Sequence, residues 1–260
     1  MSALRRFTIA PGRIDGDRVV FDRDETRHMA GVLRLAPGDL VVAADGRGRD
    51  YTVRIESLGE TATGTVLGVA TNRAEPALAI TLVQGVPKGD KMELIVRAAT
   101  ELGVARVLPA ITERTIVRLE PSRWRERARR WQRVAKEAAK QCGRGIIPEV
   151  GVPRPLAEWL EVPAGAAELR LCLWEGEALP LARALEAVAP PPRVALVLVG
   201  PEGGLARREV ELARAQGWTA ARLGPRILRT ETAGPAIAAI LQFRFGDLGG
   251  GSTAAEPIRD

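Results

Sequence analysis

The feature that most constrains the fold is an uninterrupted apolar run over residues 194–199, which leads into a Gly-Pro-Glu-Gly-Gly turn at residues 200–204. An apolar run without alternation is typical of a strand covered on both faces, as in the parallel sheet of an α/β domain. Ligands bind beyond the carboxyl ends of such strands, and glycines let the backbone approach them closely. The turn matches neither the dinucleotide fingerprint nor the P-loop. On spacing alone it is either part of a ligand site or an ordinary connection from strand to helix.

A second glycine-bearing segment, residues 223–233, follows a short predicted strand. It presents Arg226, Arg229 and Glu231 ahead of a helix predicted over residues 232–245. A loop that mixes apolar residues with arginine and glutamate can hold a ligand that has both apolar and charged parts. The alternative is that Glu231 only stabilises the N-terminus of the helix that follows.

The pattern of predicted secondary structure changes near residue 72. Before it, short runs rich in β-branched residues predict a small β-barrel, with a helical turn over residues 24–34. After it, strands alternate with helices, which predicts an α/β domain with a largely parallel sheet. The early strands are predicted over 18–21, 40–44, 51–57 and 65–70, and the later strands over 80–83, 107–110, 169–174 and 194–199. The later helices are predicted over 91–102, 122–141, 179–188, 207–216 and 232–245.

These patterns predict two domains. We expect a β-barrel domain over residues 1–71, a linker over 72–77 and an α/β domain over 78–248. The tail over residues 249–260 is rich in glycine, serine and alanine, and we expect it to be disordered.

The charge of the chain favours a polyanionic partner. The net charge is +6 and the pI is about 10.1, and bound arginines and lysines release the counterions of a nucleic acid. The alternative source of this charge is GC-rich coding, because nearly all the positive charge is arginine.

No apolar run approaches the roughly 20 residues that span a bilayer, and the first residues lack the apolar stretch of a signal peptide. We therefore expect a soluble, cytoplasmic protein. Cys142 and Cys172 are too far apart in sequence for a metal-ligand spacing and are expected to be reduced. The lone histidine, His28, favours a structural role over a catalytic one.

Two helices have marked ends. For the helix over 122–141, Ser122 is the expected N-cap and Gly143 the expected stop. For the last helix, a start at Thr232 would place Pro235 in the first turn, where a missing N–H costs nothing. The first of these helices has one apolar face, and its opposite face is either a solvated surface or an RNA contact. That opposite face carries Arg123, Arg127, Arg130 and Arg133.

Five motifs in this order resemble those of the SPOUT methyltransferases, and more narrowly those of the bacterial ribosomal small-subunit methyltransferase E family. They are Lys-Gly-Asp-Lys-Met-Glu at 88–93, Ala-Thr-Glu-Leu-Gly at 99–103, Glu-Ala-Ala-Lys-Gln at 137–141, the turn at 200–204 and the segment 223–233. The resemblance covers nearly the whole chain. The sequence departs from the family pattern at Leu205-Ala206 and at Gly234-Pro235.

The resemblance implies an α+β two-domain fold, with an N-terminal PUA-like β-barrel and a C-terminal α/β SPOUT domain that contains a trefoil knot. It implies a homodimer that uses S-adenosylmethionine, without metal or membrane, to form N3-methyluridine in 16S rRNA of the small ribosomal subunit. The implied cofactor pocket is built from three segments. Its residues are Leu173, Trp174, Glu175, Val199, Gly200, Pro201, Gly203, Gly204, Leu223, Gly224, Arg226, Ile227, Leu228 and Thr230.

Methylation at N3 requires that the uracil lose a proton, so a general base or a cation that stabilises the uracil anion is needed. We expect Glu202 and Glu231 as base or orienting carboxylate, and Arg229 or Arg226 as the cation. The alternative is that Arg229 and Glu231 only hold the knot together.

RNA contacts are expected from Arg5, Arg6, Arg34, Lys88, Lys91 and Arg144. Two other functions fit the same patterns: a nonenzymatic RNA-binding or ribosome-assembly protein, and a SPOUT enzyme that acts on another RNA, such as transfer RNA. Binding of S-adenosylmethionine distinguishes an enzyme from a binding protein.

Overall fold

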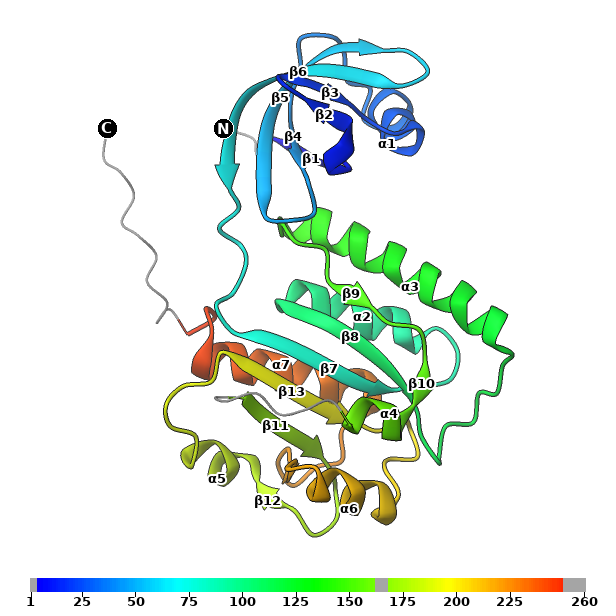
Figure 1. The fold of residues 1–260 in the computed structure, drawn as a ribbon, viewed down its shortest axis with the longest axis vertical. Helices are drawn as coiled ribbons and strands as arrows, with labels where there is room; N and C mark the ends of the chain where they lie inside the picture. Colours follow the sequence, from blue (N-terminus) through cyan, green and yellow to red (C-terminus); the bar gives the residue numbers. More distant parts are fainter. Residues whose placement is uncertain (1–3, 162–167, 250–260) are drawn as a thin grey trace. The chain divides into compact units, whose positions relative to one another are not determined.

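The computed structural model describes residues 4–161 and 168–249 (Figure 1). It divides into two compact units, one formed by residues 1–75 with 136–147 and the other by 76–135 with 148–260. The first unit thus takes in a segment from within the predicted 78–248 domain. The assignment of functions to the predicted domains stays a prediction, and the predicted disordered tail, apart from Gly249, lies outside the described residues.

The N-terminal unit contains a six-stranded sheet in the order β1-β4-β5-β6-β3-β2. The pair β1–β4 is parallel and the other pairs are antiparallel. The four predicted strands are confirmed, while β1 and β2 were missed because both are short. The bounds are β1 Arg5–Thr8, β2 Ile14–Asp15, β3 Arg18–Val20, β4 Leu40–Ala44, β5 Arg49–Leu58 and β6 Ala62–Thr71.

The helical turn predicted over 24–34 is α1, Arg23–Arg27, continued by the π-helix η2, His28–Val32; a 3₁₀ turn, η1, covers Pro11–Arg13. Asp22 caps α1 by accepting a 2.7 Å hydrogen bond from the Glu25 amide. His28 meets the Phe7 ring edge-on, with centroids 5.9 Å apart. This contact agrees with a structural role for His28.

A buried ion pair holds residues 136–147 in the N-terminal unit. The carboxylate of Glu25 is 3% exposed and lies 2.9 Å from Lys140 Nζ. Thr8 Oγ1 donates a 2.5 Å hydrogen bond to the same carboxylate. Burial on its own would raise the pKa of Glu25, but the hydrogen bonds from Thr8 and Lys140 and the charges of Lys140 and Lys136 lower it. Glu25 is therefore held ionised inside the fold.

The C-terminal unit contains an eight-stranded sheet in the order β10-β8-β7-β13-β11-β14-β12, with β9 paired to β8. Among the described residues, the strand pairs of this sheet are all parallel, as predicted. Its central strand β13 is the apolar run on which the prediction rested. The bounds are β7 Ala79–Gly85, β8 Val104–Ile111, β9 Glu149–Val150, β10 Arg154–Pro155, β11 Glu168–Leu173, β12 Leu179–Pro180, β13 Val194–Val199 and β14 Thr219–Arg222.

Helices cover both faces of this sheet (Figure 1). Helix α7 packs against α2, β7 and β13, while α4 and α6 pack together on β8 and β14. Alternate residues of β7 serve the two faces: Leu82 approaches Gly234 of α7, and Val83 joins the core with α4 and α6. The bounds are α2 Lys91–Glu101, α3 Pro121–Cys142, α4 Leu156–Leu160, α5 Leu181–Glu186, α6 Arg207–Ala215 and α7 Thr230–Phe245.

Two predicted helix starts were wrong. Helix α3 begins at Pro121 and not after Ser122, because a proline fits the first helical position, where no intrahelical acceptor is needed. Helix α7 begins at Thr230, two residues before the predicted start. Pro235 therefore lies in the second turn, where its missing N–H leaves one carbonyl without an intrahelical donor. The predicted stop of α3 is confirmed, because Gly143 has a φ of +85°.

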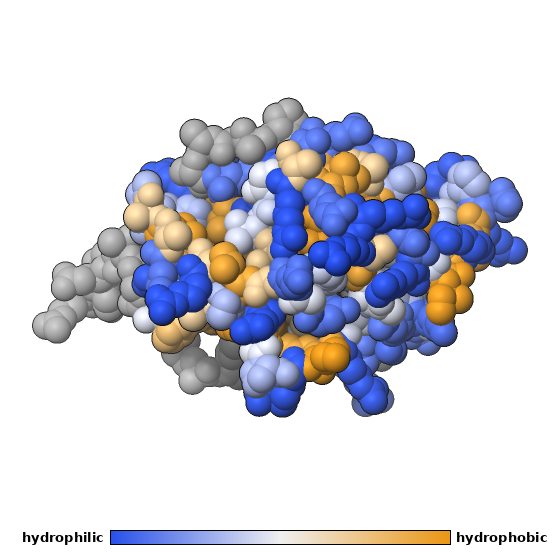
Figure 2. All heavy atoms as spheres, turned by 90° about the horizontal axis from the view of Figure 1, so that it is seen from below, coloured by the Kyte–Doolittle hydropathy of each residue, from blue (hydrophilic) through white to orange (hydrophobic). Residues whose placement is uncertain are grey.

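The face drawn in Figure 2 mixes hydrophilic side chains with small apolar patches. Within residues 4–161 and 168–249, no helix has both the length and the apolar character needed to cross a membrane. Cys142 and Cys172 are both free thiols, and burial raises the pKa of Cys172 to about 12. That both cysteines are reduced in the cell stays a prediction.

Candidate functional site

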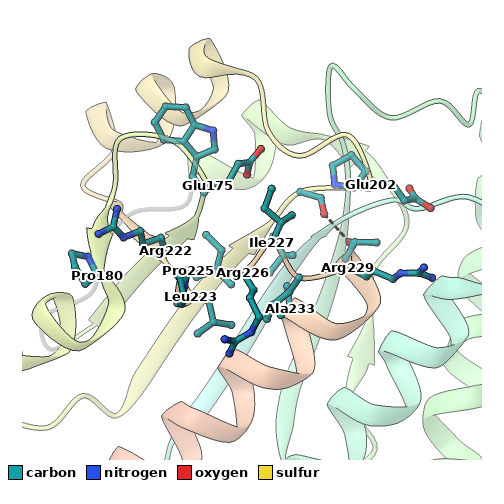
Figure 3. Close-up of a pocket in the computed structure, with 18 of the residues that line it drawn as sticks. Glu175, Pro180, Glu202, Arg222, Leu223, Pro225, Arg226, Ile227, Arg229 and Ala233 are labelled. Atoms are coloured by element: carbon teal, nitrogen blue, oxygen red, sulfur yellow. Dashed lines mark hydrogen bonds between the residues drawn. The ribbon is translucent and has the colours of Figure 1, made fainter.

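The carboxyl ends of β11, β13 and β14 open into one cavity of about 910 Å³. This volume suits a small-molecule ligand. Three segments form the cavity: the one after β11, the glycine turn after β13, and the loop between β14 and α7 (Figure 3). All the predicted cofactor residues line it except Gly203 and Gly204. Lys91, Pro180, Arg222, Pro225 and Ala233 also line it, together with the predicted catalytic residues Glu202 and Arg229.

A buried hydrogen-bond chain joins two of these segments. Thr230 Oγ1 donates a 2.7 Å hydrogen bond to the carbonyl oxygen of Gly200, drawn as a dashed line in Figure 3. Gln84, which is fully buried at the end of β7, donates to Thr230 Oγ1 at 2.8 Å. Residues far apart in sequence thereby fix the wall of the cavity. The prediction missed Gln84, although a polar residue that interrupts the apolar β7 run was a signal for it.

Glycines let the turn after β13 fold tightly. A Cβ on Gly85 would come within 2.6 Å of the Pro201 nitrogen, and a Cβ on Gly200 within 2.7 Å of the Gly204 carbonyl carbon. Gly204 itself has a φ of +71°. The carbonyl of Gly203 accepts a 2.6 Å hydrogen bond from Arg114. Gly203 and Gly204 therefore shape the turn beside the cavity, and direct cofactor contacts from them stay a prediction.

Glycine also explains one departure from the family pattern. Helix α7 crosses β7 so closely that a Cβ on Gly234 would lie 3.2 Å from both Gln84 Oε1 and Leu82 Cδ2. That separation is tighter than an ordinary van der Waals contact. The small residue allows α7 to lie against the strand whose Gln84 supports the cavity.

A lysine lies between the two predicted catalytic carboxylates. Lys91 Nζ is 3.2 Å from Glu202 Oε1 and 3.2 Å from Glu231 Oε2. Arg229 lies 3.9 Å from the other oxygen of Glu231. Glu202 also accepts a 3.1 Å hydrogen bond from the Lys88 amide. Arg229 and Glu202 lie on the same side of the cavity (Figure 3).

Glu231 Oε2 is buried and makes no hydrogen bond of good geometry, despite its 3.2 Å distance from Lys91. The distance supports an ion pair, because Coulomb attraction depends less on angle than a hydrogen bond does. We therefore treat this contact as electrostatic.

The cluster formed by Lys91, Glu202 and Glu231 keeps all three groups charged. The contact with Glu231 raises the pKa of Lys91, and Glu202 raises it further. The backbone amide of Glu231 lowers the pKa of its own carboxyl, with Lys91 and Arg229 adding to the effect. For Glu202, burial would raise the pKa, but hydrogen bonds from its own amide, from Lys88 and from Lys91 lower it overall. Carboxyls with a lowered pKa are weak proton acceptors.

The predicted RNA-binding residues divide into three groups. Arg5, Arg34 and Lys88 are exposed, and Lys91 belongs to the cavity instead. Arg6 is committed to Asp50 through two 2.6 Å hydrogen bonds.

Arg144 is only 5% exposed and pairs with Glu75 at 2.9 Å. A guanidinium that is buried and neutralised is not placed to contact a phosphate. We therefore no longer expect RNA contacts from Arg6 or Arg144. Both side chains instead hold the N-terminal unit together, in which Asn72 donates to Asp50 as well.

The cavity has the chemistry of a site for a ligand with apolar and charged parts. It combines apolar side chains, exposed backbone groups, the carboxylate of Glu175 and several arginines. Among the described residues, no group of three or more His, Cys, Asp or Glu side chains is placed to hold a metal ion.

Comparison with known proteins identifies the family. Residues 74–242 match the family described as RNA methyltransferase domain, and residues 21–62 match the RNA methyltransferase PUA domain. A ribosomal RNA small subunit methyltransferase E from Synechocystis sp. is 35% identical over 90% of this chain and 75% of its own length. The crystal structure of a protein of that name from Neisseria gonorrhoeae, bound to S-adenosyl methionine, is 32% identical, with a TM-score of 0.85 over 94% of this chain and 99% of its own. The chain therefore belongs to the ribosomal RNA small subunit methyltransferase E family.

Proposed function

We propose that this protein uses S-adenosylmethionine to methylate RNA of the small ribosomal subunit, and that the acceptor is N3 of a uridine in 16S rRNA. The observation that carries the proposal is the single cavity at the strand ends, built from the same three segments that the family resemblance implies. Support for the cofactor comes from the Neisseria gonorrhoeae relative, which was crystallised with it. We place the enzyme in the cytoplasm, where ribosomal RNA is made.

The residues of the cavity fit this cofactor. Leu173, Val199 and Leu228 supply apolar surface for an adenine ring, and the backbone of residues 223–230 supplies amides and carbonyls for its polar edges. The carboxylate of Glu175 is available to a hydroxyl or an ammonium group. The cofactor supplies a methyl group activated by a sulfonium. The chain's own task is to align the acceptor with that methyl and to exclude water.

The cluster of Lys91, Glu202 and Glu231 supplies the electrostatics of the reaction. Because both carboxyls have a lowered pKa, we assign them the orienting role rather than the role of base. They hold Lys91 protonated and point it toward the cavity that it lines. A fixed cation beside the acceptor stabilises the anion that forms when N3 loses its proton. Arg229, whose side chain is 82% exposed, adds a second positive charge that is free to follow the substrate.

RNA binding involves exposed basic groups. Arg5 and Arg34 in the N-terminal unit and Lys88 beside the cavity are free to contact phosphates. Phosphate contacts of this kind make the affinity fall as salt rises. We assign RNA binding to the unit that contains the PUA match and methyl transfer to the other.

The finer features of the fold are part of the same proposal. After β14, which lies between β11 and the edge strand β12, the chain returns to pack α7 on β7 and β13. That path supports a trefoil knot formed by the loop at 223–229. The six-stranded sheet of the N-terminal unit supports a PUA-like barrel.

Exposed apolar side chains on α2 and α7 support a homodimer. Leu94 is 52% exposed and Phe243 is 68% exposed, and burying such side chains against a second copy would be favourable.

Two measurements test the function. Calorimetric titration with S-adenosylmethionine should give saturable binding, and mass spectrometry of 16S rRNA from a strain lacking the gene should show the loss of one N3-methyluridine. A protein that binds RNA without binding the cofactor would instead be a ribosome-assembly factor. Methylation of transfer RNA but not of 16S rRNA would assign the enzyme to another substrate.

A further inference from the structure

The exposed face of α3 is an arginine-rich surface that the proposed reaction does not use. Between residues 121 and 135, which belong to the C-terminal unit, the helix carries six arginines and a single glutamate. Its apolar face is buried through Trp124, Ala128, Trp131 and Ala135. The arginines therefore lie on the remaining, outward part of the helix.

This face is not neutralised from within the protein. Arg123 pairs with Glu126, and Arg130 pairs with Glu93 and Asp90. Arg125, Arg129 and Arg133, which are all exposed, have no ion-pair partner in the part of the chain that the structure describes. Those three follow one another at spacings of four, so their like charges lie on one ridge and repel each other. A surface helix stabilised by its own charges would alternate acids and bases along such a ridge.

The arginine ridge, Arg125, Arg129 and Arg133, lies on the helix that contacts the first turn of α2. Arg130, which lies next to Arg129, is 2.5 Å from Glu93 in the first turn of α2. Lys91 lies in the same turn and reaches Glu202 in the cavity wall. The first turn of α2 therefore contacts the cavity wall through Lys91 and contacts α3 through Glu93. All of these residues belong to the C-terminal unit, so this relation does not depend on how the two units are arranged.

We propose that the arginine ridge binds the phosphate backbone of the substrate RNA next to the methylated nucleotide. The inference rests on the proposed function, because it takes the occupant to be ribosomal RNA. Charge complementarity identifies the partner: guanidinium groups bind phosphates through paired hydrogen bonds, and bound phosphate removes the repulsion along the ridge. Contacts of this kind position the RNA without reading its sequence. The ridge would give the catalytic unit RNA contacts of its own.

The test compares two triple variants that lose the same charge. The first combines Arg125→Gln, Arg129→Gln and Arg133→Gln. The matched control combines Arg183→Gln, Arg193→Gln and Arg244→Gln, all exposed residues away from α3. Binding to 16S rRNA transcribed in vitro is measured over a range of salt concentrations.

For the ridge variant, the slope of log affinity against log salt concentration should decrease in magnitude by about 2 to 3. Affinity at physiological salt should fall on the order of tenfold to hundredfold, while the control changes by less than about threefold. A third variant with lysine at the same three ridge positions keeps the charge and should keep most of the slope. All variants should bind S-adenosylmethionine as the wild type does.

Three results would overturn the inference: an unchanged slope in the ridge variant, an equal loss in the control, or a loss in the lysine variant as large as in the glutamine variant. A loss seen with intact small subunits but not with RNA alone would point to a ribosomal protein instead, and would also overturn it. Failure of the proposed function looks different. In that case the wild type itself would neither bind S-adenosylmethionine nor methylate 16S rRNA, whatever the ridge variants do.

Discussion

Two lysine–glutamate clusters, one in each unit, differ in burial and in which charge lies at the centre. In the N-terminal unit, Glu25 is 3% exposed and is met by Lys140 at 2.9 Å and Lys136 at 3.4 Å. In the C-terminal unit, Lys91 is 32% exposed and lies between two carboxylates. In the first cluster two lysines surround one buried acid, and these lysines also meet the exposed carboxylates of Asp22 and Glu137. In the second cluster two acids surround one partly exposed lysine, and Glu231 also meets Arg229.

This difference separates a structural cluster from a functional one. Both oxygens of Glu25 accept hydrogen bonds, including one from Thr8, so nothing further is needed to satisfy the acid. In the other cluster, Glu231 Oε2 has no hydrogen bond of good geometry, and Lys91 faces a cavity. A buried ion pair whose partners are satisfied stabilises one conformation. An accessible, incompletely satisfied cluster retains the capacity to interact with a substrate.

The largest effect should come from breaking the buried cluster. Glu25→Gln leaves Lys140, whose side chain is 9% exposed, without its full counter-charge. We expect a loss of about 3 kcal/mol in the free energy of unfolding, since removing one partner leaves an uncompensated buried charge. Urea denaturation measures this loss. Glu60→Gln, an exposed acid on the same unit, is the control and should change stability by less than about 0.5 kcal/mol. Equal stability of both variants would contradict the structural role.

The same cluster predicts a pH dependence. Because the pKa of Glu25 is lowered in the folded state, its stabilisation is present above the ordinary carboxyl pKa and is lost as the pH falls through the folded value. Acid should therefore destabilise the wild type more than it destabilises Glu25→Gln.

The second largest effect should come from Lys91→Met. Removing the cation should lower single-turnover methylation on the order of a hundredfold, with cofactor affinity changed by less than about threefold. If Lys91 stabilises the uracil anion, the apparent pKa of the reaction should also rise, which a merely structural role would not cause. Lys91→Arg, which keeps the charge, should recover part of the rate. An unchanged pH profile in Lys91→Met would rule out this role.

Substituting the two carboxylates in turn distinguishes two roles for them, orientation of Lys91 and general-base catalysis. With orientation alone, Glu202→Gln and Glu231→Gln should each slow methylation on the order of tenfold, since each leaves Lys91 one partner. Loss of a general base would cost on the order of a hundredfold or more in one variant only. Single-turnover rates with bound cofactor decide between orientation and general-base catalysis. An unchanged rate in both variants would exclude both roles.

The smallest effect should come from Thr230→Val. It removes the hydrogen bond to Gly200 and one acceptor of Gln84, whose amide also donates to the Gly85 carbonyl at 3.0 Å. We expect cofactor affinity to weaken by about threefold to tenfold, since a net hydrogen bond is worth roughly 1 kcal/mol. The single-turnover rate at saturating cofactor should stay within about twofold. Calorimetry measures the affinity, and Thr232→Val on the same helix is the control.

Much of the architecture was predictable from local patterns. Runs such as Val194–Val199 are buried because their side chains are apolar, and the structure confirms that strand with its predicted bounds. The elements that were missed are short, such as β1 and β2, because a few residues carry too little periodicity to be recognised. The wrong start of α7 has a tertiary cause. Thr230 bonds to Gly200 across the fold, and this contact begins the helix earlier than its capping pattern suggests.

The sequence by itself determined the two kinds of unit and the parallel sheet, because apolar periodicity is a local property. Glycine placement indicated two of the segments that line the cavity, and the family resemblance implied all three. Only the tertiary structure showed that Arg144 is buried against Glu75, that Lys91 belongs to the cavity, and that Gln84 supports its wall. The physical reason is that charge pairing and burial depend on neighbours far along the chain. The sequence alone does not distinguish an arginine or lysine that binds a phosphate from one that pairs with a buried acid or contacts a cofactor.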